Sequence, residues 1–127
     1  MTPRHQIERL LQDEPRVQFA VLVGSQANGT ATDRSDWDIA LQWTRDLNPF
    51  ETLEHAELLK QRMSQATGVH PDKIDLIDLA TARLAMRAVV AEEGIVLKGA
   101  DTLAWHHFLT ATWAALEDFY WRKRHAA

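Results

Sequence analysis

The feature that most restricts the fold of this chain is a short hydrophobic run, Val17–Val23, which is interrupted only by Gln18 and ends at Gly24. Its β-branched content favours a strand, and its nearly continuous hydrophobicity is typical of a strand that is buried on both faces. Strands of this kind belong to sheets that helices cover, so the run predicts an α/β fold.

Hydrophobic periodicity and capping residues predict the remaining elements. Thr2-Pro3 and Asn48-Pro49 each join a capping residue to a proline at the first helical position, and Asp78 is placed to cap a further helix. The expected helices cover residues 3–12, 49–67, 79–93 and 101–124, and the further strands cover 36–43, 73–77 and 95–97. The second helix carries a hydrophobic stripe made of Phe50, Leu53, Leu58, Leu59 and Met63. We therefore expect a single domain, 1–127, with a small mixed β-sheet flanked by helices and a long C-terminal helix.

Composition narrows the possible classes of protein. With 127 residues, 46% of them hydrophobic and 25% charged, the chain has the makeup of one globular domain. It has no cysteine, which rules out a disulfide framework and a cysteine nucleophile. The net charge of −4 argues against sequence-independent binding of nucleic acid. The N-terminus lacks a signal-peptide core, and no apolar stretch reaches the roughly 18 residues of a membrane span, so we expect a cytoplasmic protein.

Three aspartates are the main candidates for catalysis. Asp36 and Asp38 alternate at the start of the second predicted strand, so their carboxylates lie on one face, about 7 Å apart at the backbone. Asp75, in the third strand, completes a carboxylate triad if that strand pairs beside them. Carboxylates grouped in this way bind hard divalent cations, and paired cations are the usual device for displacement at phosphorus.

A glycine-serine pair at the end of the first strand is the candidate phosphate-binding element. Gly24 permits a close approach of the backbone, and Ser25 can open a short helix whose free N–H groups cradle phosphate. Each signal also has a simpler structural explanation, because Asp36 and Asp38 fit the solvated face of a strand and Asp75 fits an exposed edge. Their combination in one order along the chain favours a joint site.

The motif resembles a known family. Gly24-Ser25, then ten residues, then the tripeptide from Asp36 to Asp38, followed by Asp75, is similar to the signature of the polymerase-β-like nucleotidyltransferases. Within that superfamily the short chain resembles the minimal nucleotidyltransferases, which act as MntA-type antitoxins beside a HEPN-domain toxin. The likeness covers nearly the whole chain.

The resemblance implies roles for the site residues. Asp36 and Asp38 would bind two Mg²⁺ ions, Asp75 would complete the metal-binding triad and help to activate the acceptor hydroxyl, and Gly24-Ser25 would hold the triphosphate of ATP. One departure from the family pattern is Asn28, which stands where many relatives carry an arginine that contacts phosphate.

The implied function is that of an antitoxin that transfers AMP from ATP to a tyrosine hydroxyl of a HEPN-type ribonuclease toxin. Two alternatives remain open at this point. The chain could neutralise the toxin by occlusion without catalysis, or it could modify a small molecule such as an aminoglycoside. The long C-terminal helix is the expected contact with the partner, since its aromatic content is typical of protein interfaces. The expected interface residues are Trp105, Phe108, Leu109, Trp113, Leu116 and Tyr120.

Overall fold

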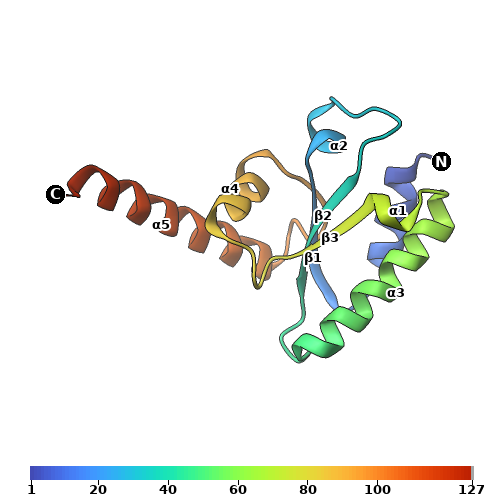
Figure 1. Cartoon of the computed structure of the whole chain (residues 1–127). Coiled ribbons are helices and arrows are strands. Elements are labelled where there is room, and N and C mark those ends of the chain that lie inside the picture. Colours follow the sequence, from blue (N-terminus) through green and yellow to red (C-terminus); the bar gives the residue numbers. More distant parts are fainter. Residues whose placement is uncertain (127) are drawn as a thin grey trace.

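A computed structural model describes residues 1–126 and contains one mixed four-stranded sheet in the order β3-β2-β1-β4 (Figure 1). The central strand β1 runs antiparallel to both β2 and β4, whereas β2 and β3 are parallel. The strands are β1 (Val17–Val23), β2 (Trp37–Trp43), β3 (Ile74–Asp78) and β4 (Ile95–Lys98). This arrangement confirms the expected small mixed sheet.

Helices cover both faces of the sheet. The helices are α1 (Pro3–Gln12), α2 (Ser25–Asn28), α3 (Pro49–Thr67), α4 (Leu84–Glu93) and α5 (Leu103–His125). Figure 1 shows α1 and α3 on one side of the sheet and α4 and α5 on the other, with α2 at one end. The sheet therefore separates two hydrophobic cores, one on each face.

Strand β1 supplies side chains to both cores, as its hydrophobic run predicts. Ala20 and Leu22 belong to the core under α1 and α3, and Phe19, Val21 and Val23 belong to the core under α4 and α5. All five are at most 3% exposed. Burial of this apolar surface from two sides is the main contribution to stability that one strand of this length can make.

The first and third helices begin at their predicted caps. The Thr2 side chain accepts a hydrogen bond from the backbone of His5, and Asn48 forms a reciprocal capping box with Glu51. Helix α3 ends at Gly68, whose φ of 77° is the left-handed conformation that favours glycine.

The predicted hydrophobic stripe on α3 is only partly correct. Leu59 and Met63 are buried against the sheet, whereas Phe50, Leu53 and Leu58 are at least 50% exposed. The exposed residues lie on the outer half of the helix, because a helix lying on a sheet covers only its inner half.

The prediction for the start of α4 is wrong. Asp78 is the last residue of β3, and its side chain accepts a hydrogen bond from the backbone N–H of Ala80, so it stabilises a turn. Leu79 extends the sheet, because its N–H donates to the Leu41 carbonyl and its side chain is buried. The helix therefore starts only at Leu84.

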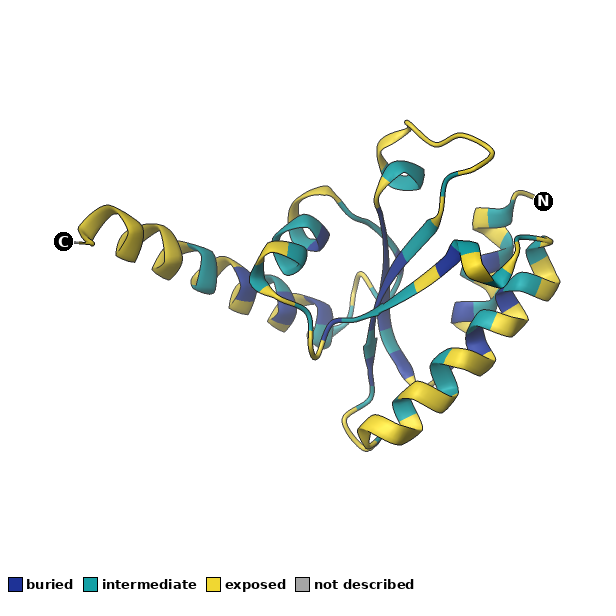
Figure 2. Ribbon diagram, in the orientation of Figure 1, coloured by how far each residue is buried: buried dark blue, intermediate teal, exposed yellow. Residues whose placement is uncertain are grey.

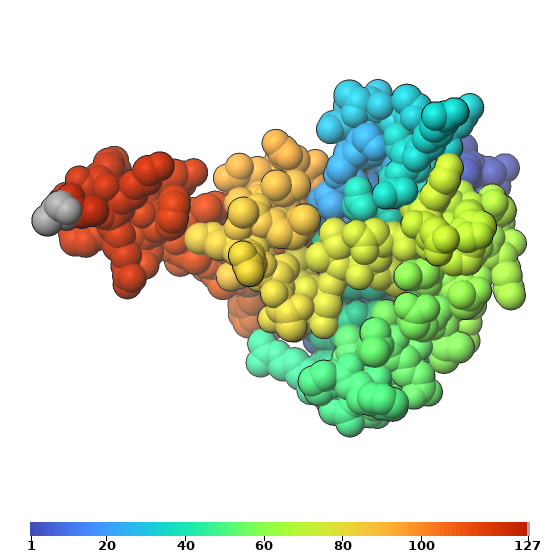
Figure 3. Space-filling view, in the orientation of Figure 1, coloured from blue at the N-terminus to red at the C-terminus, as the bar shows by residue number. Residues whose placement is uncertain are grey.

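Helix α5 is anchored at its beginning and projects from the body at its end. Phe19 packs against Trp105 and Phe108, with ring centroids 5.1 and 5.5 Å apart. The later turns are exposed along their length and stand clear of the body (Figures 2 and 3). No helix among residues 1–126 is both long enough and apolar enough to cross a membrane.

Candidate active site

The parallel pairing of β2 and β3 brings the predicted aspartates to one end of the sheet. Asp38 is the register partner of Asp75, and Asp36 directly precedes Trp37, which pairs with Ile74. Trp37 and Ile74 pack toward the core under α1 and α3. Because side chains alternate along a strand, Asp36, Asp38 and Asp75 lie on the opposite face, the one that α4 and α5 cover elsewhere.

The end of β1 lies directly against the aspartates. Val23 pairs with Asp38, so the next residue, Gly24, lies beside the Asp38 carboxylate. A Cβ atom on Gly24 would be 2.6 Å from Oδ2 of Asp38, and the φ of Gly24 is +75°. Two independent constraints, steric and conformational, therefore require glycine at this position.

The pair Gly24-Ser25 begins the short helix α2, as expected. The Gly24 carbonyl accepts hydrogen bonds from the N–H groups of Ala27 and Asn28. The first N–H groups of any helix have no acceptor within the helix. The opening of α2 thus lies next to Asp38, on the same end of the sheet as the carboxylates.

The carboxylates influence one another electrostatically. The pKa of Asp38 is raised by burial, and further by the negative charges of Asp75 and Asp36. None of the three forms an ion pair with a side chain of residues 1–126. A site that concentrates negative charge without a cationic partner is suited to binding cations.

The donor set fits a hard divalent cation in chemistry, since it consists of carboxylate oxygens. Across the described residues, 1–126, no three histidine, aspartate or glutamate side chains are already arranged around one point as a metal site. The roles of Asp36, Asp38 and Asp75 as metal ligands therefore remain predictions, supported by their shared position.

Two other polar residues near the site have structural roles. Oδ1 of Asn28 accepts hydrogen bonds from the backbone N–H and the hydroxyl of Thr30, at 3.1 and 2.6 Å. Its side chain thus stabilises the turn after α2. Lys73, which precedes β3, donates from Nζ to the backbone carbonyl of Asp33 at 3.3 Å. This contact joins residues 40 positions apart, and it follows only from the parallel pairing of β2 and β3.

A cavity of about 630 Å³ lies next to the carboxylates but not at them. The loop between α2 and β2 forms one wall, through residues 31–33 and 35, and Trp37, Val69, His70 and Lys73 are also in the lining. Because Trp37 and Asp38 point to opposite faces of the sheet, the three candidate residues Asp36, Asp38 and Asp75 are not part of this lining.

The predicted partner-contacting residues of α5 have different environments. Trp105 and Phe108 are at most 9% exposed and belong to the core of the chain itself, and Leu109 packs against that core. Trp113 is 48% exposed and Tyr120 is 54% exposed. These two residues, with the half-buried Leu116, are the part of the predicted interface that a partner can reach.

A groove between α4 and α5 was not apparent from the sequence. It encloses about 280 Å³ and is lined by Leu84, Ala85 and Ala88 of α4 and by Leu116, Phe119 and Tyr120 of α5. The sequence did not mark the two alanines as groove residues, because they line a groove only when α4 and α5 cross in this way.

Comparison with protein families gives a match over most of the chain. A family model described as polymerase beta, nucleotidyltransferase, matches residues 5–103. This region contains the whole sheet and ends at the first residue of α5. No curated protein sequence matches the chain.

Solved structures with the same fold come from toxin–antitoxin complexes. One, described as a toxin–antitoxin with AMP-PNP, is 27% identical with a TM-score of 0.72, over 95% of this chain and 93% of that one. A second, an MntA-HpeT toxin–antitoxin variant in which two aspartates spaced two residues apart are glutamate, is 25% identical with the same TM-score and coverage. A third, a tri-AMPylated HEPN toxin of Shewanella oneidensis in complex with its MNT antitoxin, is 24% identical with a TM-score of 0.65, over 96% and 91%, and shows the fold.

Proposed function

Because this chain belongs to the polymerase beta nucleotidyltransferase family, we propose that it is an antitoxin that transfers AMP from ATP to a tyrosine hydroxyl of a cognate HEPN-type toxin. The observation that carries the proposal is the position of Asp38, which lies between Asp75 and the backbone of Gly24. Carboxylates and a close backbone approach at one point are what the transfer of a nucleotide requires.

The proposed reaction is a displacement at the α-phosphorus of ATP. The tyrosine oxygen forms the new bond to phosphorus, the bond to pyrophosphate breaks, and the hydroxyl proton leaves to a base. Asp75 is exposed and is our candidate for that base, and Gly24 and Ser25 hold the phosphates. Mg²⁺ bound by Asp36, Asp38 and Asp75 would supply charge neutralisation and would align the attacking and leaving oxygens.

The nucleotide and the partner are proposed from the solved relatives. The relative that is 27% identical is a toxin–antitoxin with an ATP analogue, AMP-PNP. The relative that is 25% identical carries glutamate at two aspartates with the spacing of Asp36 and Asp38. The first relative supports ATP as the donor, and both support a toxin as the partner of this chain.

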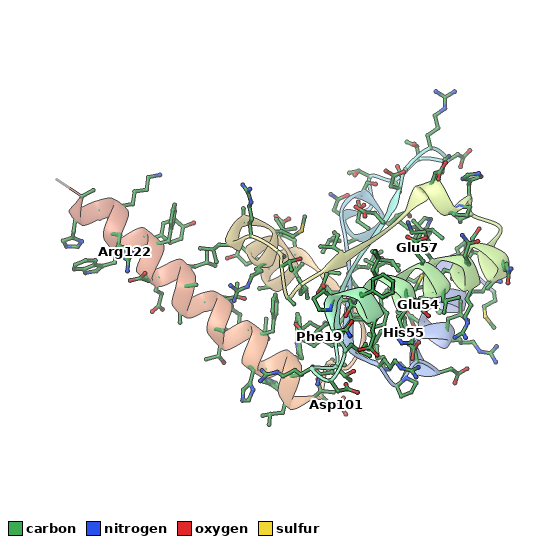
Figure 4. All side chains as sticks on the ribbon, turned by 60° about the horizontal axis from the view of Figure 1, so that its bottom comes forward. Phe19, Glu54, His55, Glu57, Asp101 and Arg122 are labelled. Atoms are coloured by element: carbon green, nitrogen blue, oxygen red, sulfur yellow. The ribbon has the colours of Figure 1, made fainter. Side chains whose placement is uncertain are left out.

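The surface proposed for the toxin is the groove between α4 and α5 together with the exposed end of α5. The groove is apolar, two of its lining residues, Phe119 and Tyr120, are at least half exposed, and the exposed Trp121 follows them on α5. Arg122 follows them, near the projecting end of the helix (Figure 4). Exposed aromatics with a polar rim are typical of protein interfaces.

Labelled ATP tests the transfer. The cognate toxin is incubated with this chain, Mg²⁺ and ATP labelled at either the α- or the γ-phosphate. We expect the α-label to appear on the toxin and the γ-label to remain in pyrophosphate. Transfer of the γ-label, or of neither label, would contradict the proposal.

The docking surface is tested by measuring the affinity for the toxin. We expect Ala88→Arg or Tyr120→Asp to weaken binding at least tenfold, since each puts charge into an apolar contact. Leu53→Asp is the matched control, because Leu53 is 62% exposed on α3, on the other face of the sheet. Equal affinities for all three variants and the wild type would rule out the groove.

Occlusion without catalysis is the second candidate, and the exposed end of α5 favours it. The two mechanisms differ in their dependence on the carboxylates. If occlusion suffices, a chain with Asp36→Asn and Asp38→Asn neutralises the toxin as well as the wild type does.

A further inference from the structure

We propose that Lys73 is a positioning residue that fixes Asp36 for metal binding, by tethering the loop between α2 and β2. The inference rests on the proposed function, because it assigns the metal-binding role to Asp36. The juxtaposition that supports it is the contact of Lys73 with Asp33, three residues before Asp36.

The loop has little else to hold it. Within residues 1–126, the hydrogen bonds of residues 31–35 are local, between Thr32, Arg34 and Ser35, except for the bond from Lys73 to the carbonyl of Asp33. The loop also borders the cavity of about 630 Å³, so it is not packed along its length against the body. Among these hydrogen bonds, the bond from Lys73 is the one that joins the loop to a distant part of the chain.

The backbone of Lys73 is held firmly. It ends the short 3-10 helix Pro71–Lys73, its backbone N–H donates to the His70 carbonyl, and the next residue, Ile74, is 2% exposed in the core. A side chain that extends from a fixed backbone to a loosely packed loop can define where the loop ends. The loop ends at Asp36, next to the first residue pair of β2 and β3.

The position of Asp36 depends more on such a tether than the positions of Asp38 and Asp75 do. Asp38 and Asp75 lie within strands, where ladder hydrogen bonds fix the backbone, whereas Asp36 directly precedes β2. Ligands that are held in place before the metal arrives bind it more tightly, and supporting residues commonly change affinity by about 10–100-fold.

A simple electrostatic role for Lys73 makes the opposite prediction. An ammonium group near carboxylates opposes the binding of another cation, so its removal would tighten metal binding. Tethering predicts that its removal weakens metal binding. The sign of the change therefore separates the two roles.

The test is a titration of the full-length chain with Mn²⁺, with the free ion followed by EPR. We expect Lys73→Met to raise the half-saturating Mn²⁺ concentration about tenfold, and Lys73→Arg, which keeps a donor of similar reach, to restore most of the affinity. Lys60→Met is the matched control, since Lys60 pairs with Glu57 on α3. Circular dichroism establishes that each variant is folded.

If the wild type binds Mn²⁺ and Lys73→Met binds it equally well or more tightly, the tethering role of Lys73 is wrong. The proposed function is unaffected by that result. If the wild type binds no Mn²⁺, the metal-dependent function fails, and the tether fails with it. The readout is metal affinity, so it does not depend on the toxin or on transfer.

Discussion

Asp38 is a residue whose charge opposes folding. Burial and the charges of Asp75 and Asp36 raise its pKa above the usual value for aspartate. The folded chain therefore holds the Asp38 proton more tightly than the unfolded chain does. In linkage terms, this contribution to stability is present at low pH and is lost as the pH rises through the folded pKa.

The first prediction follows from the raised pKa of Asp38. In EDTA, Asp38→Asn is expected to raise the free energy of unfolding at pH 7 by less than about 1 kcal/mol, because it removes the crowded charge but solvent screens a partly exposed carboxylate. The gain should shrink as the pH falls toward 3, where Asp38 is protonated in the wild type. Urea denaturation at several pH values measures it. Glu54→Gln, on α3, is the control and should show no such trend (Figure 4).

The second prediction concerns two glycines that share a positive φ but differ in ψ, which is −158° at Gly24 and 10° at Gly29. Gly24 and Gly29 have φ values of 75° and 81°, but only Gly24 has an atom close to where a Cβ would lie. We expect Gly29→Ala to lose about 1–2 kcal/mol of stability from the left-handed backbone, and Gly24→Ala to lose more, because its combination of φ and ψ is open essentially to glycine alone. Only Gly24→Ala should also lose nucleotide transfer.

Urea denaturation and the labelled-ATP assay together test this pair. Full activity in Gly24→Ala would mean that the close approach to Asp38 is not needed. Loss of activity in Gly29→Ala would mean that the strained turn, and not the contact with Asp38, is what matters.

The sequence alone indicated Asp36, Asp38 and Asp75 as candidate site residues, because the alternation of side chains along a strand can be read from the local sequence. Lys73 could not be assigned in this way. Its acceptor is 40 residues away, and the contact depends on which strand lies beside β2 and in which direction it runs.

At the scale of helices and strands, the sequence predicted helix ends correctly where a capping residue determines the end of the helix. Asn48 and Gly68 define α3 because each satisfies backbone groups within its own turn. Asp78 failed as a cap because tertiary burial of Leu79 holds the chain against the sheet. The strand β3 accordingly ends one residue later, and α4 starts five residues later, than the sequence predicted.

The third prediction tests the cap of α3. Asn48→Ala is expected to lower the free energy of unfolding by about 1 kcal/mol, because the N–H of Glu51 loses its acceptor. Asn48→Asp keeps an acceptor and should retain most of the stability. Both variants should transfer nucleotide normally, since α3 covers the face of the sheet opposite the carboxylates. An unchanged midpoint of urea denaturation for Asn48→Ala would contradict the capping role.

At the scale of the whole molecule, α5 combines two roles. Its first turns complete the core of the chain, through Trp105 and Phe108, and its last turns are exposed. The aromatic residues of α5 predicted one continuous partner interface along the helix. The sequence of a helix does not show how many of its turns pack against the sheet of its own chain. The family model matches residues 5–103 and so ends at the first residue of α5, whereas the match to the solved toxin–antitoxin structures covers 95% of the chain.

The fourth prediction concerns the anchor of α5. Phe19 is fully buried between β1 and α5, and Phe19→Ala is expected to cost about 3–5 kcal/mol in the free energy of unfolding. Phe50→Ala is the matched control, because Phe50 is 75% exposed on α3, and it should cost less than about 0.5 kcal/mol. Similar costs for the two variants, measured by urea denaturation, would contradict the packing described for α5.

We propose that nucleotide transfer at the carboxylate site is what neutralises the toxin. The most direct measurement records the intact mass of the cognate toxin and its ribonuclease activity in the same samples, after incubation with Mg²⁺, ATP and this chain. We predict that the toxin gains one or more AMP masses and loses activity in parallel. With Asp36→Asn and Asp38→Asn, the mass should not change and the toxin, once separated from the antitoxin, should remain active. A toxin that loses its activity permanently without a gain in mass would contradict the account.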